Sequence, residues 1–339
     1  MQLIPLLETL RLENIDDKVY FSNKYEDYIS NSKLGLINPE QGGSWEKYKA
    51  GFAGNKIYSD SLKFGSAIHE SQLQPESFFI VDTVNRPTAK VGFISDLLYT
   101  TKERELTTEL ISKAALEVDY YKGILSKNQV DKVKETLIPY FKQRREFEAT
   151  LDTDKTPIYL DATTRERYYA CANALNANNK IQSLLKPKGV LSDPLSYNEQ
   201  TILLDVEVRI ENQEPFILKL KSKLDNFTID TENNVITVND IKTTGKRVNL
   251  FHEAIDTYHY CRELGMYSWL LGLCAQKFYG LNNPVVKGNF LVVSTIPQYY
   301  TKVVPMTKSM FLKGFKEFKT LLELVANYTH NDRCEQLEV

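Results

Sequence analysis

KSKLDNFTIDTENNVITVNDIKTT, residues 221–244, alternates apolar and polar residues on both sides of a turn-forming cluster at 230–234. The alternation predicts two β-strands joined as a hairpin. A turn centred on residues 232–233 places Asp225 directly opposite Asp240. Cross-strand partners have Cβ atoms about 5 Å apart. The hairpin therefore predicts two carboxylates that face each other at close range.

Lys242 follows Asp240 by two residues, so it projects from the same face of the predicted strand. Facing carboxylates repel each other, and a divalent cation such as Mg²⁺ offsets that repulsion with carboxylate, phosphate and water ligands. Such an ion promotes phosphodiester hydrolysis, and a nearby ammonium neutralises developing charge. Asp225, Asp240 and Lys242 are therefore the candidate catalytic residues. The alternative is an Asp–Lys surface pair, because Asp-x-Lys is a common tripeptide.

The segments around this hairpin predict an α/β fold with a central mixed β-sheet flanked by helices. Hydrophobic periodicity predicts helices in the first half of the chain, at 25–35, 61–74, 104–149 and from Asp161 to about 185. Further strands are predicted at 201–210, 215–227, 290–295 and 299–304. A helical region spans about 249–278, with Gly265 as a candidate break, and an apolar stripe at 311–325 predicts a C-terminal helix.

A change from helical to β-strand periodicity divides the chain into a mainly helical part, residues 1–190, and a β-rich part, residues 191–339. We expect the two parts to pack as one compact unit. The N-terminus carries acids where a signal peptide has a basic start, and no apolar run reaches membrane-spanning length. These features predict a cytoplasmic protein with no membrane partner.

Composition is that of an ordinary globular protein, with 42% hydrophobic and 25% charged residues. The net charge of −2 counts mildly against a nucleic-acid partner, although a local basic groove is compatible with it. The spacings of the four cysteines fit neither a zinc site nor an iron–sulfur site, so we expect no cluster. The cysteines are Cys171, Cys261, Cys274 and Cys334.

The pattern Asp225…Asp240-Ile-Lys242-Thr-Thr resembles the core motif of the PD-(D/E)XK nuclease superfamily, and most closely its RecE-type (exodeoxyribonuclease VIII-like) and phage exonuclease branch. Three other segments match this branch in the same order along the chain. They are the GxxxH motif Gly65-Ser-Ala-Ile-His69, the acidic segment at Asn198-Glu199, and Glu263-Leu-Gly-Met-Tyr267 in place of QxxxY. Each piece is weak alone, but together they imply a restriction-endonuclease-like core.

The resemblance implies a role for each matched residue. His69, Asp225, Asp240 and Glu199 would bind Mg²⁺, for which Mn²⁺ would substitute because histidine is a common transition-metal ligand. Glu207 is the rival to Glu199, although it could equally be an ordinary exposed strand glutamate. The candidate DNA-binding residues are Lys223, Thr243, Thr244, Glu263 and Tyr267.

Several of these residues keep a structural alternative. Lys223 could be a surface lysine, and the threonines could be ordinary strand-end residues. Tyr267 could simply pack on the sheet. Glu263 replaces the usual Gln, so an amide donor becomes an acid, and Leu224 stands where the branch often has Pro.

The function implied by the resemblance is exonucleolytic cleavage of double-stranded DNA from 5′ ends, which serves recombination. The expected partners are DNA ends, a single-strand annealing protein and other copies of the chain in a ring, in a phage-encoded setting. Two alternatives stay open at this level: an endonuclease or nickase of the same fold, and a catalytically silent DNA-binding scaffold.

Overall fold

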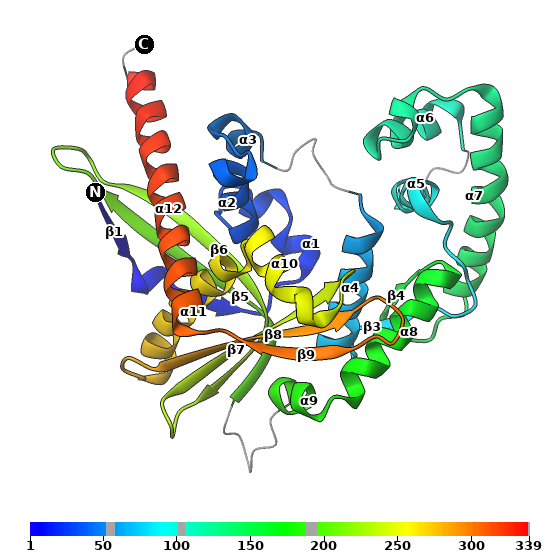
Figure 1. Ribbon diagram of the computed structural model, residues 1–339. Coiled ribbons are helices and arrows are strands. Elements are labelled where there is room, and N and C mark those ends of the chain that lie inside the picture. Colours follow the sequence, from blue (N-terminus) through cyan, green and yellow to red (C-terminus); the bar gives the residue numbers. More distant parts are fainter. Residues whose placement is uncertain (52–57, 101–105, 187–194, 338–339) are drawn as a thin grey trace. The chain divides into compact units, whose positions relative to one another are not determined.

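The computed structural model describes residues 1–51, 58–100, 106–186 and 195–337. The chain divides into two compact units, residues 1–51 with 174–339 and residues 52–173. The first unit contains the central sheet and the second is mainly helical (Figure 1). The division falls at residues 51 and 173 rather than at 190, because the N-terminal strands pair with the sheet of the first unit.

The sheet of the first unit has the strand order β1-β5-β6-β7-β8-β9, and β2 also pairs with β5. Neighbouring strands are antiparallel except for β7 and β8, which run parallel. The predicted mixed sheet flanked by helices is thus confirmed, as a mostly antiparallel one. The strands are β1 (Gln2–Pro5), β2 (Arg11–Glu13), β5 (Leu195–Arg209), β6 (Phe216–Asp230), β7 (Val235–Thr244), β8 (Val285–Ser294) and β9 (Thr301–Pro305).

The hairpin formed by β6 and β7 has the register that its turn predicts. Asp230 pairs with Val235 and Asn226 pairs with Asn239, so the turn is centred on residues 232–233. Asp230 stabilises the turn, because its carboxylate accepts hydrogen bonds from the backbone N–H and side-chain amide of Asn233 at 2.9 and 2.8 Å.

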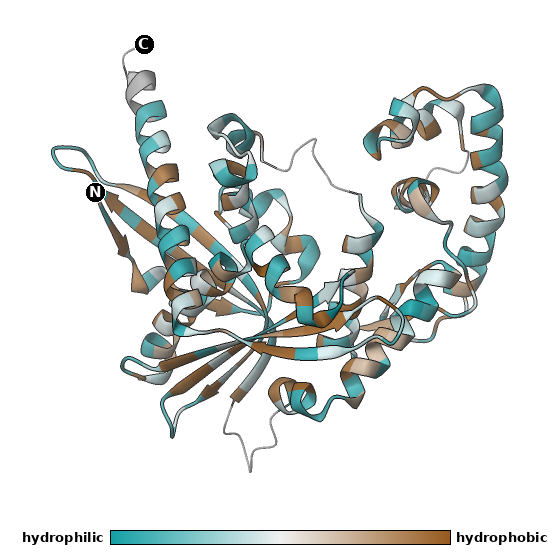
Figure 2. Ribbon diagram, viewed as in Figure 1, coloured by the Kyte–Doolittle hydropathy of each residue, from teal (hydrophilic) through white to brown (hydrophobic). Residues whose placement is uncertain are grey.

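Helices cover the sheet within the first unit. The hydrophobic residues of the strands, brown in Figure 2, pack with apolar side chains of α11 and α12 into one core. The helices of this unit are α1 (Asp17–Tyr20), α2 (Asn31–Ile37), α3 (Trp45–Ala50), α9 (Asn179–Leu185), α10 (Phe251–Thr257), α11 (Tyr260–Tyr279) and α12 (Lys308–Leu337).

The predicted helical region at 249–278 does break in two, but not at Gly265. The break falls at His259, whose φ of 54° ends α10 and starts α11. Gly265 lies inside α11, where α12 crosses so closely that a Cβ would stand 2.6 Å from the backbone nitrogen of Phe315. Gly265 is therefore a helix-crossing residue rather than a helix breaker.

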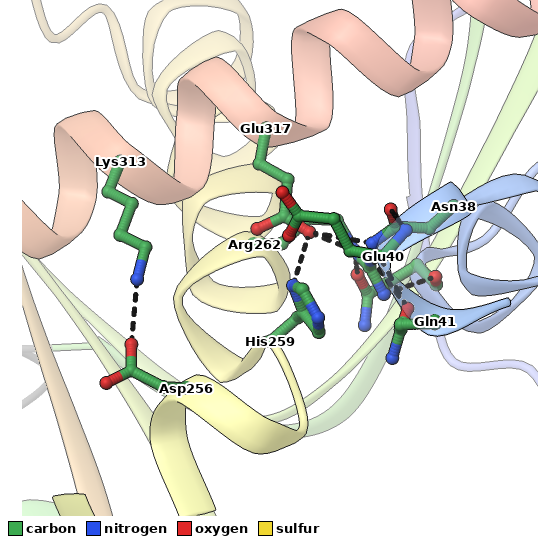
Figure 3. Close-up of polar contacts among 9 residues, drawn as sticks. Asn38, Glu40, Gln41, Asp256, His259, Arg262, Lys313 and Glu317 are labelled. Carbon is green, nitrogen blue, oxygen red and sulfur yellow. Dashed lines mark hydrogen bonds and ion pairs between the residues drawn. The ribbon is translucent and has the colours of Figure 1, made fainter. Parts of the chain in front are cut away.

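A buried polar network joins the start of α11 to α12 and to the segment after α2 (Figure 3). The guanidinium of Arg262 donates to the Glu317 carboxylate at 3.0 Å and to Gln41 at 3.1 Å. His259 Nδ1 lies 2.7 Å from the same carboxylate. Because Arg262 directly precedes Glu263, this network fixes the part of α11 that faces the ends of the central strands.

The second unit has its own hydrophobic core, built mainly from α5, α6 and α7. The predicted helix at 61–74 is confirmed as α4, and the two amphipathic patterns at 104–149 correspond to α6 and α7. Asp161 starts α8 as expected, since its carboxylate accepts from the backbone N–H of Thr164 at 3.0 Å. The elements are α4 (Asp60–Leu73), β3 (Phe78–Ile80), α5 (Ala89–Thr100), α6 (Thr108–Glu117), α7 (Lys127–Glu148), β4 (Thr156–Ile158) and α8 (Ala162–Ala177), whose last turn belongs to the first unit.

Candidate active site

Asp225 lies where β6 and β7 separate. The ladder between them ends at the pair Asn226–Asn239, one residue before Asp225. Beyond that point the Asp225 carboxylate replaces a backbone carbonyl as hydrogen-bond acceptor, because its Oδ2 accepts from the N–H of Ile241 at 2.8 Å. The side chain is thereby held beside the start of the Asp240–Lys242 segment, as the hairpin register predicts.

Glu199 lies next to Asp225 on the neighbouring strand. The register of β5 and β6 places Glu199 across from Asp225, between the pairs Asn198–Asn226 and Gln200–Leu224. A carboxylate oxygen of Glu199 lies within 4.8 Å of one of Asp225. Glu199 has a φ of 52°, a left-handed conformation that non-glycine residues adopt at a cost of roughly 1 kcal/mol or more. Such strain inside a strand is typical of functional sites.

The ammonium group of Lys242 has two acidic partners. Its Nζ lies 2.8 Å from Oδ2 of Asp240 and 3.0 Å from Oε2 of Glu263. The same nitrogen lies 4.7 Å from the centre of the Tyr260 ring, within range of a cation–π interaction. Burial by itself lowers the pKa of Lys242, but the carboxylates of Asp240 and Glu263 outweigh it and raise the pKa well above its usual value. Lys242 is therefore held as a cation.

Asp240 is a buried acid with an incompletely satisfied oxygen. Its Oδ2 accepts no hydrogen bond from the described residues, although the Lys242 ammonium lies beside it as an ion pair. Burial raises the pKa of the Asp240 carboxyl, the Lys242 ammonium opposes this rise, and the Asp225 carboxylate adds to it. A buried carboxylate that needs more positive charge fits a divalent cation with oxygen ligands.

Glu263 and Tyr267 lie one helical turn apart on α11, as their spacing predicts. The Tyr267 hydroxyl donates to Oε1 of Glu263 at 3.2 Å, while Oε2 pairs with Lys242. Burial raises the pKa of Tyr267 well above its usual value, so the phenol stays protonated as a donor. In this structure Glu263 contacts the Lys242 ammonium, and Tyr267 contacts Glu263. A role of either residue toward DNA stays a prediction.

The other candidate residues of the first unit have different environments. Lys223 forms ion pairs with Asp17 and, at 3.4 Å, with Glu199, so its charge is already compensated. The Thr244 hydroxyl accepts from the N–H of Lys246 at 3.2 Å, and Thr243 is half-buried opposite Val293.

Glu207, the rival of Glu199, lies far from the site. The two acids are eight positions apart along β5, which corresponds to roughly 26 Å of extended strand. The Glu207 carboxylate instead pairs with Arg209.

His69 lies near the end of α4, within the second unit, and its side chain is half-buried. Its role as a metal ligand stays a prediction.

The sequence motifs do not predict two features of the site. Tyr260 lies beneath the lysine, and the apolar spacing of the helix gives no signal that separates it from other core residues. Each site acid also has an asparagine as its neighbour in sequence, in Asn198-Glu199, Asp225-Asn226 and Asn239-Asp240. That repeated pairing is visible in the sequence and could have been found.

Comparisons with known proteins find matches among solved structures. No protein-family model matches the chain, and no curated protein matches it. Among solved structures, the chain is similar to a protein from Eubacterium rectale that is described provisionally as an exonuclease, at 11% identity, with 94% of this chain and 88% of that chain covered and a TM-score of 0.39. A TM-score of this size does not establish a shared fold. No described helix is both long and apolar enough to cross a membrane.

Proposed function

We propose that the protein is a metal-dependent deoxyribonuclease. The observation that carries this proposal is the arrangement at the point where β6 and β7 separate. Glu199 and Asp225 present carboxylates within 4.8 Å of each other, and the buried Asp240 lies beside a lysine held as a cation. Acidic oxygens with an adjacent ammonium are the groups that phosphodiester hydrolysis requires.

Glu199, Asp225 and Asp240 would hold the cation, and His69 would complete the ligand set, as its sequence motif implies. The oxygen-rich set favours Mg²⁺, and an added imidazole would let Mn²⁺ substitute. When bound, the ion polarises the phosphodiester and makes a water molecule more acidic.

The residues of the chain perform the remaining tasks. The Ile241 N–H holds the Asp225 carboxylate in one orientation at 2.8 Å. Lys242 supplies a fixed positive charge where negative charge develops on the phosphate oxygens. Glu263 keeps that ammonium in place, since it pairs with Lys242 independently of Asp240. Asp240 is buried and Lys242 is half-buried, which strengthens these interactions because little water screens them.

More specifically, the protein would be an exonuclease that degrades one strand of duplex DNA from its 5′ end and supplies 3′ single strands to an annealing partner. This reading follows the sequence resemblance. Several copies in a ring would sum modest basic patches into a positive channel, which makes a net charge of −2 per chain compatible with DNA binding.

Hydrolysis of end-labelled linear duplex with Mg²⁺ or Mn²⁺, against an EDTA control, tests the proposal. Asp225→Asn is the sharpest variant, because an amide oxygen can still accept from the Ile241 N–H while the ligand charge is lost. We expect its rate to fall by about 10²-fold or more with the fold retained. Wild-type cleavage by this variant, or no cleavage by the wild type with either metal, would contradict the proposal.

A covalently closed circle is the matched second substrate. An exonuclease leaves it intact, because it offers no end. Cleavage of the circle would instead assign an endonuclease or nickase to the same site.

A further inference from the structure

Four asparagine side chains form a continuous hydrogen-bonded chain across four neighbouring strands. The Nδ2 of Asn289 on β8 donates to Oδ1 of Asn239 on β7 at 3.0 Å. Asn239 in turn donates to Asn226 on β6 at 2.8 Å, and Asn226 donates to Asn198 on β5 at 2.7 Å. The amides of Asn289, Asn239 and Asn226 thus all donate in the same direction across the sheet.

The asparagine chain follows the strand register. Asn198 pairs with Asn226, Asn226 with Asn239, and Asn239 with Asn289 in the backbone ladders. Asn226 is 0% and Asn239 1% exposed. A buried amide left without a partner is costly, so a shift of one strand against its neighbour would break the chain and be penalised.

The last turn of α9 anchors the middle of the asparagine chain. Asn239 donates to the carbonyl of Leu184 at 3.2 Å, and Asn226 donates to that of Leu185 at 3.4 Å. Carbonyls at a helix end have no partner within the helix, so both sides gain from this contact. The two central amides are thus fixed by strands and helix together.

Three members of the asparagine chain adjoin the site acids. Asn198 precedes Glu199, Asn226 follows Asp225 and Asn239 precedes Asp240. Consecutive residues of a strand point to opposite faces, so the amides of Asn226 and Asn239 lie behind the two aspartates.

The carboxylates in front repel one another and favour separation of β6 from β7. The amides behind oppose that separation at the point where the backbone ladder ends, at the pair Asn226–Asn239.

We propose that the asparagine chain holds Glu199, Asp225 and Asp240 in place for a divalent cation. Asn198, Asn226 and Asn239 are positioning residues, because they act through the neighbouring acids, whereas Asn289 adjoins no acid. The inference rests on the proposed function. It adds that hydrogen bonds among the asparagines hold the three acids in place when no ion is bound. Residues that orient metal ligands in this way typically change metal affinity by about 10- to 100-fold when removed.

Asn198→Ala and Asn289→Ala form a matched pair for the test. Each variant removes one end of the asparagine chain and one hydrogen bond to its interior, but only Asn198 adjoins an acid. Mn²⁺ binding to the full-length protein is measured by calorimetry without DNA, and unfolding by urea is measured without metal. We expect about tenfold weaker Mn²⁺ binding for Asn198→Ala, wild-type binding for Asn289→Ala, and similar losses of stability for both.

Equal Mn²⁺ affinities for wild type and Asn198→Ala, or an equal loss for Asn289→Ala, would overturn the inference while the proposed function stands. A wild-type protein that binds no Mn²⁺ would overturn the proposed function and the inference with it. Asn226→Ala, which removes a central amide, is expected to weaken binding further. If that variant does not fold, the end pair still decides the question.

Discussion

Lys221 carries its charge in a buried position. It lies buried on β6, where its Nζ donates to the Tyr20 carbonyl at 2.9 Å and lies 4.5 Å from the centre of the Tyr20 ring. Burial, with a smaller effect from the charge of Lys33, lowers the pKa of Lys221 to about 8. The folded state therefore releases this proton at a lower pH than the unfolded state does.

This shift predicts the pH dependence of stability. Between pH 8 and about 10.5 the unfolded chain binds more protons at Lys221 than the folded chain, so this group raises the free energy of unfolding as pH increases through that window. Below it, the cost of the buried charge is fully present. We expect Lys221→Met to be more stable than wild type by about 3 kcal/mol at pH 7, and by progressively less toward pH 10.5.

Urea unfolding of both proteins between pH 7 and 10.5 measures this difference, and other titrating groups cancel in the comparison. A difference that stays constant with pH would show that Lys221 is not the group involved.

At the scale of elements, the contact between α11 and α12 depends on Gly265. A Cβ there would lie 2.6 Å from the Phe315 nitrogen, whereas a Cβ at Gly272, on the same helix, meets nothing within 4 Å. We expect Gly265→Ala to lower the free energy of unfolding by about 1–3 kcal/mol through overpacking. Gly272→Ala should raise it by up to about 1 kcal/mol through helix propensity. Chemical unfolding of the two variants checks both signs, and equal effects would refute the close crossing.

Two ion pairs of α12, one with α11 and one with α10, allow a second comparison. Glu317 pairs with the buried Arg262, whereas Lys313 and Asp256 form a pair whose side chains are 63% and 70% exposed (Figure 3). Glu317→Ala leaves a buried guanidinium without its acid, so we expect a loss of about 3–5 kcal/mol. Lys313→Ala should cost less than about 1 kcal/mol, because solvent screens that pair. Thermal or urea unfolding distinguishes the two, and similar losses would contradict the assignment.

Sequence periodicity predicts local elements well and long-range partners poorly. The β6–β7 register follows from one turn, because the turn residues lie within the hairpin itself. The pairing of β1 and β2 with β5 joins segments almost 200 residues apart, and no local pattern in residues 2–13 reports it. The sequence likewise predicts a helix break at Gly265, whereas the break lies at His259. The glycine is instead explained by the close crossing of α11 and α12, which no local pattern reports.

For the site, local reasoning predicts the pairing of Asp240 with Lys242, because strand alternation places both on one face. It does not predict that Glu263 completes the lysine's surroundings, since that contact depends on how α11 packs on β7.

At the scale of the whole molecule, metal binding should couple to stability. A cation that binds only the folded protein stabilises it by about 2.7 kcal/mol at a concentration of 100 times its Kd. We therefore expect Mn²⁺ to raise the melting temperature of the wild type, and His69→Ala to need more Mn²⁺ for the same rise. Calorimetric melting with increasing Mn²⁺ measures this. Identical curves for the two proteins would remove His69 from the ligand set.

The pairing of β1 with β5 has a consequence for how the protein is made. Residues 2–5 find their partners only at residues 206–209, so the first strand leaves the ribosome long before the strand that binds it. At about 5–20 residues per second, that interval lasts roughly 10–40 seconds. During that interval the N-terminal strand lacks its β5 partner, so its backbone N–H and C=O groups are open to pairing with another chain.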